Sequence, residues 1–178
     1  MNYRYPLYAL LTLLLLAACD GPPTGERIGP DFEPPECNRD FSGERTGVTD
    51  RDMLGHINEL RTKGCTCGSS YLPPVPPLRL SAQLTRIAKG HAADMRAQGE
   101  ITHTSTNGDN PLERVRAAGF PAALVGENVG WWILTEQEMT EVWIRDASAC
   151  ARMLSPDFQY FGGGRVETWW VQVFASRE

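Results

Sequence analysis

The sequence predicts an α+β domain in which helices cover a small antiparallel sheet. One observation is the presence of capped segments with apolar residues at helical spacing, at 49–64, 81–99, 110–119 and from 135 onward. The other is the presence of runs rich in valine and tryptophan, at 124–133 and 167–175, which are typical of strands. A further strand, broken by glycines, is expected within 157–166.

The second and third helical segments carry clear start and stop signals. Ser81 is a good N-cap for the second helix, and Gly99 stops it. The third helix has Asn110 as its cap and Pro111 at its first position, and it ends at Gly119.

The first and fourth helical segments begin with capping-box patterns. Thr49 and Asp52 form such a pattern with Asp in place of the usual Glu, and Thr135 and Glu138 form the standard one. We expect the fourth helix to continue until it runs into Pro156.

The first residues have the layout of an export signal. Arg4 precedes an apolar run at 7–16 that is too short to span a bilayer, and "LAAC" follows it. This ending is similar to a bacterial lipobox, which predicts residues 1–18 as a lipoprotein signal peptide and Cys19 as the lipidated N-terminus. The alternative is a plain signal peptide cut near the alanines, with Cys19 incidental. We expect an exported protein, lipid-anchored to the bacterial cell envelope in the periplasm or on the outer face of a membrane.

Composition separates a tether from a folded domain. Residues 19–47 are rich in proline, glycine and charge without an apolar period, which predicts a tether. Residues 48–178 are then enough for one domain. The net charge of −5 and the lack of any Lys/Arg run argue against nucleic acid as the partner.

The remaining cysteines predict disulfides. Without Cys19 the chain keeps Cys37, Cys65, Cys67 and Cys150, an even number in an oxidising compartment. A bridge from Cys65 to Cys67 would close a strained ring, so Cys37 and Cys150 each pair with one of these two. A metal site is the alternative, but "CTC" lacks the spacing of a zinc motif.

Several segments, in order, resemble the CAP superfamily, which comprises cysteine-rich secretory proteins, antigen 5 and plant pathogenesis-related class 1 proteins. The similarity covers about residues 50–175 and is closest to the bacterial exported branch with its SCP domain. It rests on "INELRTKG", "PPLRLSAQLTRIAKGHAADM", "ITHTS", "DNPLERVRAAGF", "GENVGWW", "EVWIRDASACARMLSPDF" and "WWVQVF". The resemblance implies a three-layer α-β-α sandwich with an open cleft on one face.

The resemblance also implies a set of cleft residues. In the family, two histidines and two acidic residues line the cleft and can hold a divalent metal such as zinc. His103 in "ITHTS", Glu127 in "GEN" and Asp146 in "WIRD" match three of these positions. Ala149 stands where the second histidine is expected. The retained cysteine implies the pairing Cys67–Cys150, and hence Cys37–Cys65.

The site residues have simpler interpretations as well. A buried Glu127 needs a partner, which His103 supplies whether or not a metal binds. Asp146 could instead pair with Arg145 or Arg152, or cap a helix end.

Other chemistry-bearing residues are expected to be structural. We interpret His56 and His91 as packing residues on helices, and the tryptophan pairs as sheet core and cleft wall. Ser105 and Ser148 lack the surroundings of a catalytic nucleophile.

These considerations favour a binding protein over an enzyme. With one nitrogen ligand among three, we expect at most weak binding of a divalent metal such as zinc. The expected occupant of the cleft is a small apolar or lipid ligand, or a protein partner. The alternative is a divalent-metal-dependent hydrolase, protease-like, in which His103, Glu127 and Asp146 hold an ion that activates water.

Overall fold

The computed structural model describes residue 37 and residues 49–132 and 134–177. These residues all belong to one compact unit, 34–178. The predicted signal peptide, Cys19 and most of the predicted tether lie outside the described residues. Within the described part of the chain, no helix has both the length and the apolarity needed to cross a bilayer.

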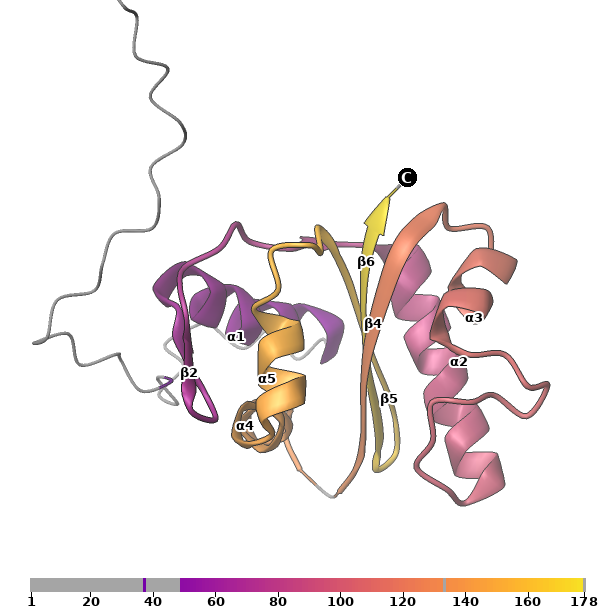
Figure 1. The fold of residues 1–178 in the computed structure, drawn as a ribbon. Helices are drawn as coiled ribbons and strands as arrows, with labels where there is room; N and C mark the ends of the chain where they lie inside the picture. The colour runs from indigo at the N-terminus through magenta and orange to yellow at the C-terminus, as the bar shows by residue number, and fades with distance from the viewer. Residues whose placement is uncertain (1–36, 38–48, 133, 178) are drawn as a thin grey trace, which may run out of the picture. The chain divides into compact units, whose positions relative to one another are not determined.

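A four-stranded sheet forms the middle layer, in the order β3-β5-β6-β4 (Figure 1). Its strands are β3 (Arg79–Leu80), β5 (Tyr160–Val166), β6 (Trp169–Arg177) and β4 (Ala122–Trp131). Strands β3 and β5 pair in parallel, and the other neighbours pair antiparallel. The register places Glu127 opposite Val173 and Gly130 opposite Trp170. A separate hairpin joins β1 (Cys65–Cys67) to β2 (Ser70–Leu72).

Helices cover both faces of the sheet, as expected for a three-layer sandwich (Figure 1). On one side lie α2 (Ala82–Gln98) and α3 (Pro111–Ala117). On the other lie α1 (Thr49–Lys63), α4 (Glu136–Arg145) and α5 (Ala147–Met153). The α+β prediction is therefore confirmed.

Strand β6 supplies both cores because its side chains alternate between the two faces. Trp170 and Phe174 belong to the hydrophobic cluster shared with α1, α4 and α5. Val171, Val173 and Ala175 belong to the cluster shared with α2 and α3. Each layer of helices therefore has its own core, and the sheet separates the two.

The glycines of β5 have a different role from the one expected. The strand is continuous through Gly162, Gly163 and Gly164, so the prediction that glycines break it is wrong. A Cβ on Gly162 would lie 2.2 Å from the Leu84 carbonyl carbon, and one on Gly164 would lie 2.4 Å from the Lys89 nitrogen. The glycines therefore allow the backbone of α2 to pack directly on the strand.

The capping signals place most helix ends correctly. Asn110 with Glu113, and Thr135 with Glu138, form complete capping boxes, while Ser81 caps α2 and Gly99 ends it in the left-handed region. The fourth helix differs from the prediction because it stops at Arg145 and a new helix begins at Ala147.

Two disulfides tie the chain together, Cys37–Cys65 and Cys67–Cys150. This is the pairing that the family resemblance implied. The second bridge fastens α5 to the β1–β2 hairpin, and Cys65 Sγ lies 3.8 Å from Cys150 Sγ.

Candidate functional site

Glu127 is a buried carboxylate on the edge strand β4, with only 3% of its surface exposed. His103, in the loop between α2 and α3, donates from Nδ1 to Glu127 Oε1 at 2.9 Å. The other side of this imidazole faces solvent, since the His103 side chain is about half exposed. The structure therefore brings two of the predicted site residues into direct contact.

Arg114, which the sequence analysis did not identify, is the second partner of Glu127. The capping box at Asn110 starts α3, and this helix presents Arg114 to the strand. Its Nη2 donates to Glu127 Oε2 at 2.6 Å, and its Nη1 donates to Ser105 Oγ at 2.6 Å. The Glu127 charge is thus balanced by a guanidinium that is itself 12% exposed. No local signal in the sequence marks this contact, because it depends on which face of α3 meets β4.

His91 also belongs to this network. It is buried on α2, which agrees with its interpretation as a packing residue, yet its ring is not surrounded only by apolar groups. Nε2 donates to the Thr102 carbonyl at 2.8 Å and lies 3.7 Å from Glu127 Oε1. Burial lowers the pKa of His91 below its usual 6.5, Glu127 opposes this shift most strongly, and Arg114 reinforces it. The imidazole is therefore held in its neutral form.

Asp146 is the residue that divides the expected fourth helix. Its exposed side chain accepts a hydrogen bond from the Ala149 backbone nitrogen at 2.7 Å, which makes it the N-cap of α5. Of the alternatives considered from sequence, the helix cap is the one for which the structure shows a contact.

His103, Glu127 and Asp146 line one cavity of about 370 Å³, here called the cleft. It lies along β4, α4, the start of α5 and the loop after α2. Among the residues that the structure describes, however, the only three His, Cys, Asp or Glu residues with ligand atoms within 4.8 Å of one another are Cys37, Cys65 and Cys150. Those three are in disulfides.

The cleft residues do not fit a divalent metal ion. Both oxygens of Glu127 already accept hydrogen bonds, from His103 and Arg114. Asp146 caps a helix, and Ala149 offers no ligand atom. Arg152 lines the same cleft and adds positive charge, which opposes cation binding.

One wall of the cleft is apolar and open to solvent. Trp131 and Trp132, at the end of β4, are 46% and 56% exposed, and Ile101 is 50% exposed. Four further apolar residues line the cleft: Val129, Met139, Val142 and Trp143. Large exposed apolar side chains gathered on one cavity indicate a contact surface for an apolar partner.

Another part of the cleft, around Arg152, is polar. Arg152 Nη1 donates to Asn128 Oδ1, and Asn128 Nδ2 donates to Gln172 Oε1 at 3.0 Å. Arg152 Nη2 lies 3.5 Å from Ser148 Oγ. The cleft therefore combines an aromatic wall with a fixed cationic part.

Comparison with known proteins identifies the family to which this fold belongs. The model of the cysteine-rich secretory protein family (CAP) matches residues 54–174. The chain therefore belongs to the CAP family.

Similar proteins come from several bacteria. The uncharacterized protein YkwD of Bacillus subtilis (strain 168) is 25% identical over 103 residues, which are 57% of this chain and 40% of YkwD. An extracellular protein with an SCP domain from Bacillus anthracis str. Ames is 19% identical with a TM-score of 0.64, over 73% of this chain and 40% of that one. An outer surface protein from Borrelia burgdorferi is 23% identical with a TM-score of 0.61, over 74% and 96%. At these identities the two structures show a shared fold, and the chain spans only 40% of the first two relatives.

Proposed function

We propose that this protein binds a small apolar or lipid ligand in the cleft, outside the cytoplasm. The observation that carries the proposal is the pair of half-exposed tryptophans, Trp131 and Trp132, on the wall of the cleft. Burying such rings against an apolar ligand removes a large apolar area from water. The cleft volume of about 370 Å³ suits a small ligand.

The polar part of the cleft favours an amphiphile over a plain hydrocarbon. Arg152 is held in place by Asn128, and it can donate to the oxygen atoms of a headgroup. A ligand with an apolar body and an oxygen-bearing head matches both parts of the cleft.

Location is part of the same proposal. Residues 1–18 act as a signal peptide, and lipidation of Cys19 anchors the domain to a membrane of the cell envelope through the tether. Support comes from the two disulfides and from relatives whose names describe an extracellular and an outer surface protein. An anchored domain would meet its lipid ligand at the membrane surface.

The contacts of the cleft residues argue against the hydrolase alternative, although His103, Glu127 and Asp146 do line one cavity. This alternative requires His103, Glu127 and Asp146 to hold an ion. Glu127 instead accepts a hydrogen bond from Arg114, and Asp146 accepts one from the Ala149 backbone nitrogen at the start of α5. A protein partner at the cleft is instead an outcome of the test below, because the same aromatic wall could contact another chain.

The test is a titration of the purified protein with palmitate and, separately, with a lysophospholipid. Tryptophan fluorescence reports the binding. We expect saturable binding that Trp132→Ala weakens by about tenfold, through the loss of apolar contact area. Leu124→Ala is the matched control, because Leu124 lies on β4, the strand that Trp132 directly follows, and is 44% exposed but does not line the cleft. Binding of neither lipid, or equal weakening by both variants, would contradict the proposal and leave a protein partner to be sought.

A further inference from the structure

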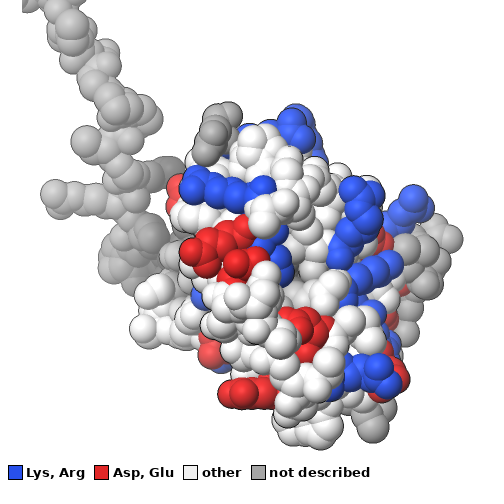
Figure 2. Space-filling view, turned by 90° about the vertical axis from the view of Figure 1, so that its right-hand side faces the viewer, with Lys and Arg blue, Asp and Glu red and all other residues white. Residues whose placement is uncertain are grey.

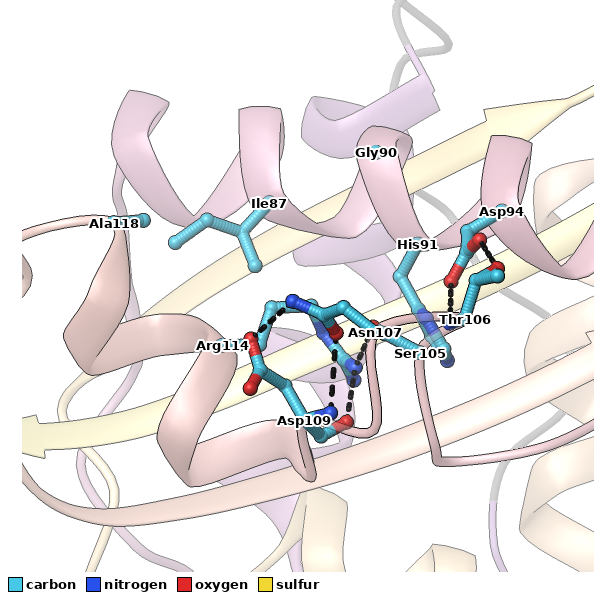
Figure 3. A pocket seen from close by; sticks show the side chains of 10 residues that line it. All are labelled: Ile87, Gly90, His91, Asp94, Ser105, Thr106, Asn107, Asp109, Arg114 and Ala118. Atoms are coloured by element: carbon cyan, nitrogen blue, oxygen red, sulfur yellow. Dashed lines mark hydrogen bonds between the residues drawn. The ribbon is translucent and has the colours of Figure 1, made fainter.

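The side of the sheet that α2 and α3 cover has a second cavity, of about 390 Å³, between these helices and the loop that joins them (Figure 3). Polar side chains on its lining bond to one another. Thr106 donates to Asp94 from its backbone nitrogen at 2.9 Å, and Asn107 Nδ2 donates to Asp109 Oδ2 at 2.8 Å. On the surface of this side, acidic and basic side chains are interspersed (Figure 2). The disulfide-bonded cysteines lie on the opposite side of the sheet, in the core beneath α1, α4 and α5.

The sulfur atoms of these cysteines form one group, here called the sulfur cluster, where the β1–β2 hairpin lies beside α5 (Figure 1). Cys65 and Cys67 are two residues apart on β1, and alternate residues of a strand point to the same face. Cys37 bridges the first of them, and Cys150 on α5 bridges the second. The two disulfides therefore lie next to each other.

The two disulfides are close enough for exchange between them. Cys65 Sγ lies 3.8 Å from Cys150 Sγ, although these two atoms belong to different bridges. The Sγ atoms of Cys37, Cys65 and Cys150 all lie within 4.8 Å of one another. A thiolate breaks a disulfide by direct attack on one of its sulfur atoms. A thiolate formed at Cys65 would therefore have the Cys150 sulfur as an immediate neighbour.

Burial selects the sulfur atom at which an outside reagent begins. Cys65 and Cys150 are fully buried and Cys67 is 4% exposed, whereas Cys37 is only partly buried. An external thiol therefore reaches Cys37 first, and attack on Cys37 Sγ makes Cys65 the leaving group. The sulfur atom that is released is the one that lies next to Cys150.

We propose that the sulfur cluster is a thiol-exchange site that takes a small thiol compound on Cys37. In the first step the thiolate of the compound bonds to Cys37 Sγ, and the Cys37–Cys65 bond breaks. In the second step the Cys65 thiolate bonds to Cys150 Sγ, and the bond from Cys150 to Cys67 breaks. The negative charge of the incoming thiolate ends on Cys67. The number of sulfur–sulfur bonds stays the same, so the exchange needs no oxidant and no second reductant.

The exchange would change how α5 is held. The Cys67–Cys150 bridge fastens α5 to β1, and a Cys65–Cys150 bridge would fasten it about 6.6 Å further along the same strand. Helix α5 carries Arg152, which lines the cleft. A thiol compound attached at the sulfur cluster would thus act on the polar part of the cleft from outside it. The exchange itself does not depend on which ligand the cleft binds.

The test is a reaction of the purified protein with glutathione, followed by acid quenching and labelling of free thiols with N-ethylmaleimide. We expect glutathione on Cys37 and the label on Cys67. The label should be on Cys67 in at least about a tenth of the glutathione-modified molecules, because two bridges in similar surroundings exchange with an equilibrium constant near one. Protein kept without glutathione should carry no label on Cys65 or Cys67.

Peptide mapping locates the label. Trypsin cuts after Lys63 and Arg79, so one peptide, 64–79, holds both Cys65 and Cys67. Fragmentation of this peptide at Thr66 in a mass spectrometer tells the two positions apart. The label on one of them and the cross-link to Cys150 on the other together identify the bridge that is present.

The variant Cys37→Ser isolates the second step, because it leaves Cys65 without its partner, as the external thiol would. We expect the label on both Cys65 and Cys67, in amounts within about tenfold of each other and unchanged by dilution, since the exchange occurs within one molecule. Cys37→Ser combined with Cys65→Ser is the matched control. It lacks the same bridge but has no thiol next to Cys150, so Cys67 should stay unlabelled.

Three results would overturn the proposal. The first is the absence of glutathione on Cys37, which would mean that a small thiol does not reach the sulfur cluster. The second is label on Cys65 alone, in the glutathione-treated protein and in Cys37→Ser, which would mean that the second bridge does not exchange. The third is equal labelling of Cys67 in the single and the double variant, which would mean that its bridge opens without Cys65.

Discussion

The two faces of the sheet pack against their helices in different ways. On the face that α2 covers, glycines in β5 let the helix backbone approach the strand closely. On the opposite face, large apolar side chains and a disulfide hold the helices in place. Gly162 and Gly164 bring the α2 backbone onto β5. On the other side, Phe161, Trp170 and Phe174 fill the space beneath α1, α4 and α5. The packing of one face therefore depends on the absence of side-chain atoms at two glycines. The packing of the other depends on contacts and a bridge between elements that are distant in sequence.

The largest loss of stability should come from removing the Cys67–Cys150 disulfide. Replacing Cys67 and Cys150 with alanine should cost about 4.5 kcal/mol of unfolding free energy, because this bridge closes a loop with a sequence separation of 83. The same replacement at Cys37 and Cys65, with a separation of 28, should cost about 3.5 kcal/mol. Urea denaturation measures both. An equal or reversed order would mean that loop length does not control the contribution of these bridges.

The close-packed side should be nearly as sensitive to a single methyl group. Gly162→Ala places a Cβ 2.2 Å from the backbone of α2, which must move, and the expected cost is about 3 kcal/mol. Gly90→Ala, on α2 itself, is the control and should stabilise the protein by about 0.5 kcal/mol, since a Cβ there meets nothing within 4 Å. Thermal unfolding of the two variants checks the contrast, and a tolerated Gly162→Ala would show that α2 can shift freely.

The smallest effect should concern His91, whose Nε2 lies 3.7 Å from Glu127 Oε1. Its folded-state pKa lies below 6.5, so the unfolded chain binds the proton more readily. The neutral ring contributes stability that is fully present above the unfolded pKa and is lost as the pH falls from about 6.5 toward the lowered folded value. The charged groups acting on it are Glu127, Arg114 and Asp94.

The measurement is the unfolding free energy of the protein and of His91→Gln as the pH is lowered through this window. Glutamine can still donate to the Thr102 carbonyl but does not titrate, so the variant should lose less stability over the same range. Parallel losses in both proteins would assign the effect to the carboxylates instead of His91.

The candidate site also contains contacts that the sequence predicts and contacts that depend on the tertiary structure. Pairing of His103 with Glu127 could be predicted, because a buried carboxylate needs a partner and the two motifs were recognisable. Arg114 and the polar role of His91 could not, because each depends on which helix face meets β4. The break at Asp146 was missed for a related reason, since an acidic residue in mid-helix and one between two helices have the same local pattern.

By itself the sequence determined the α+β class, the capped helix ends at Ser81, Asn110 and Thr135, and membership of the CAP family through its motifs. These features rest on interactions within a few residues of the chain, or on whole motifs. Only the tertiary structure decided that Arg114 neutralises Glu127 and that α2 packs against the glycines of β5. The physical reason is that burial and charge balance depend on side chains brought together from distant segments, and local patterns do not record those distances.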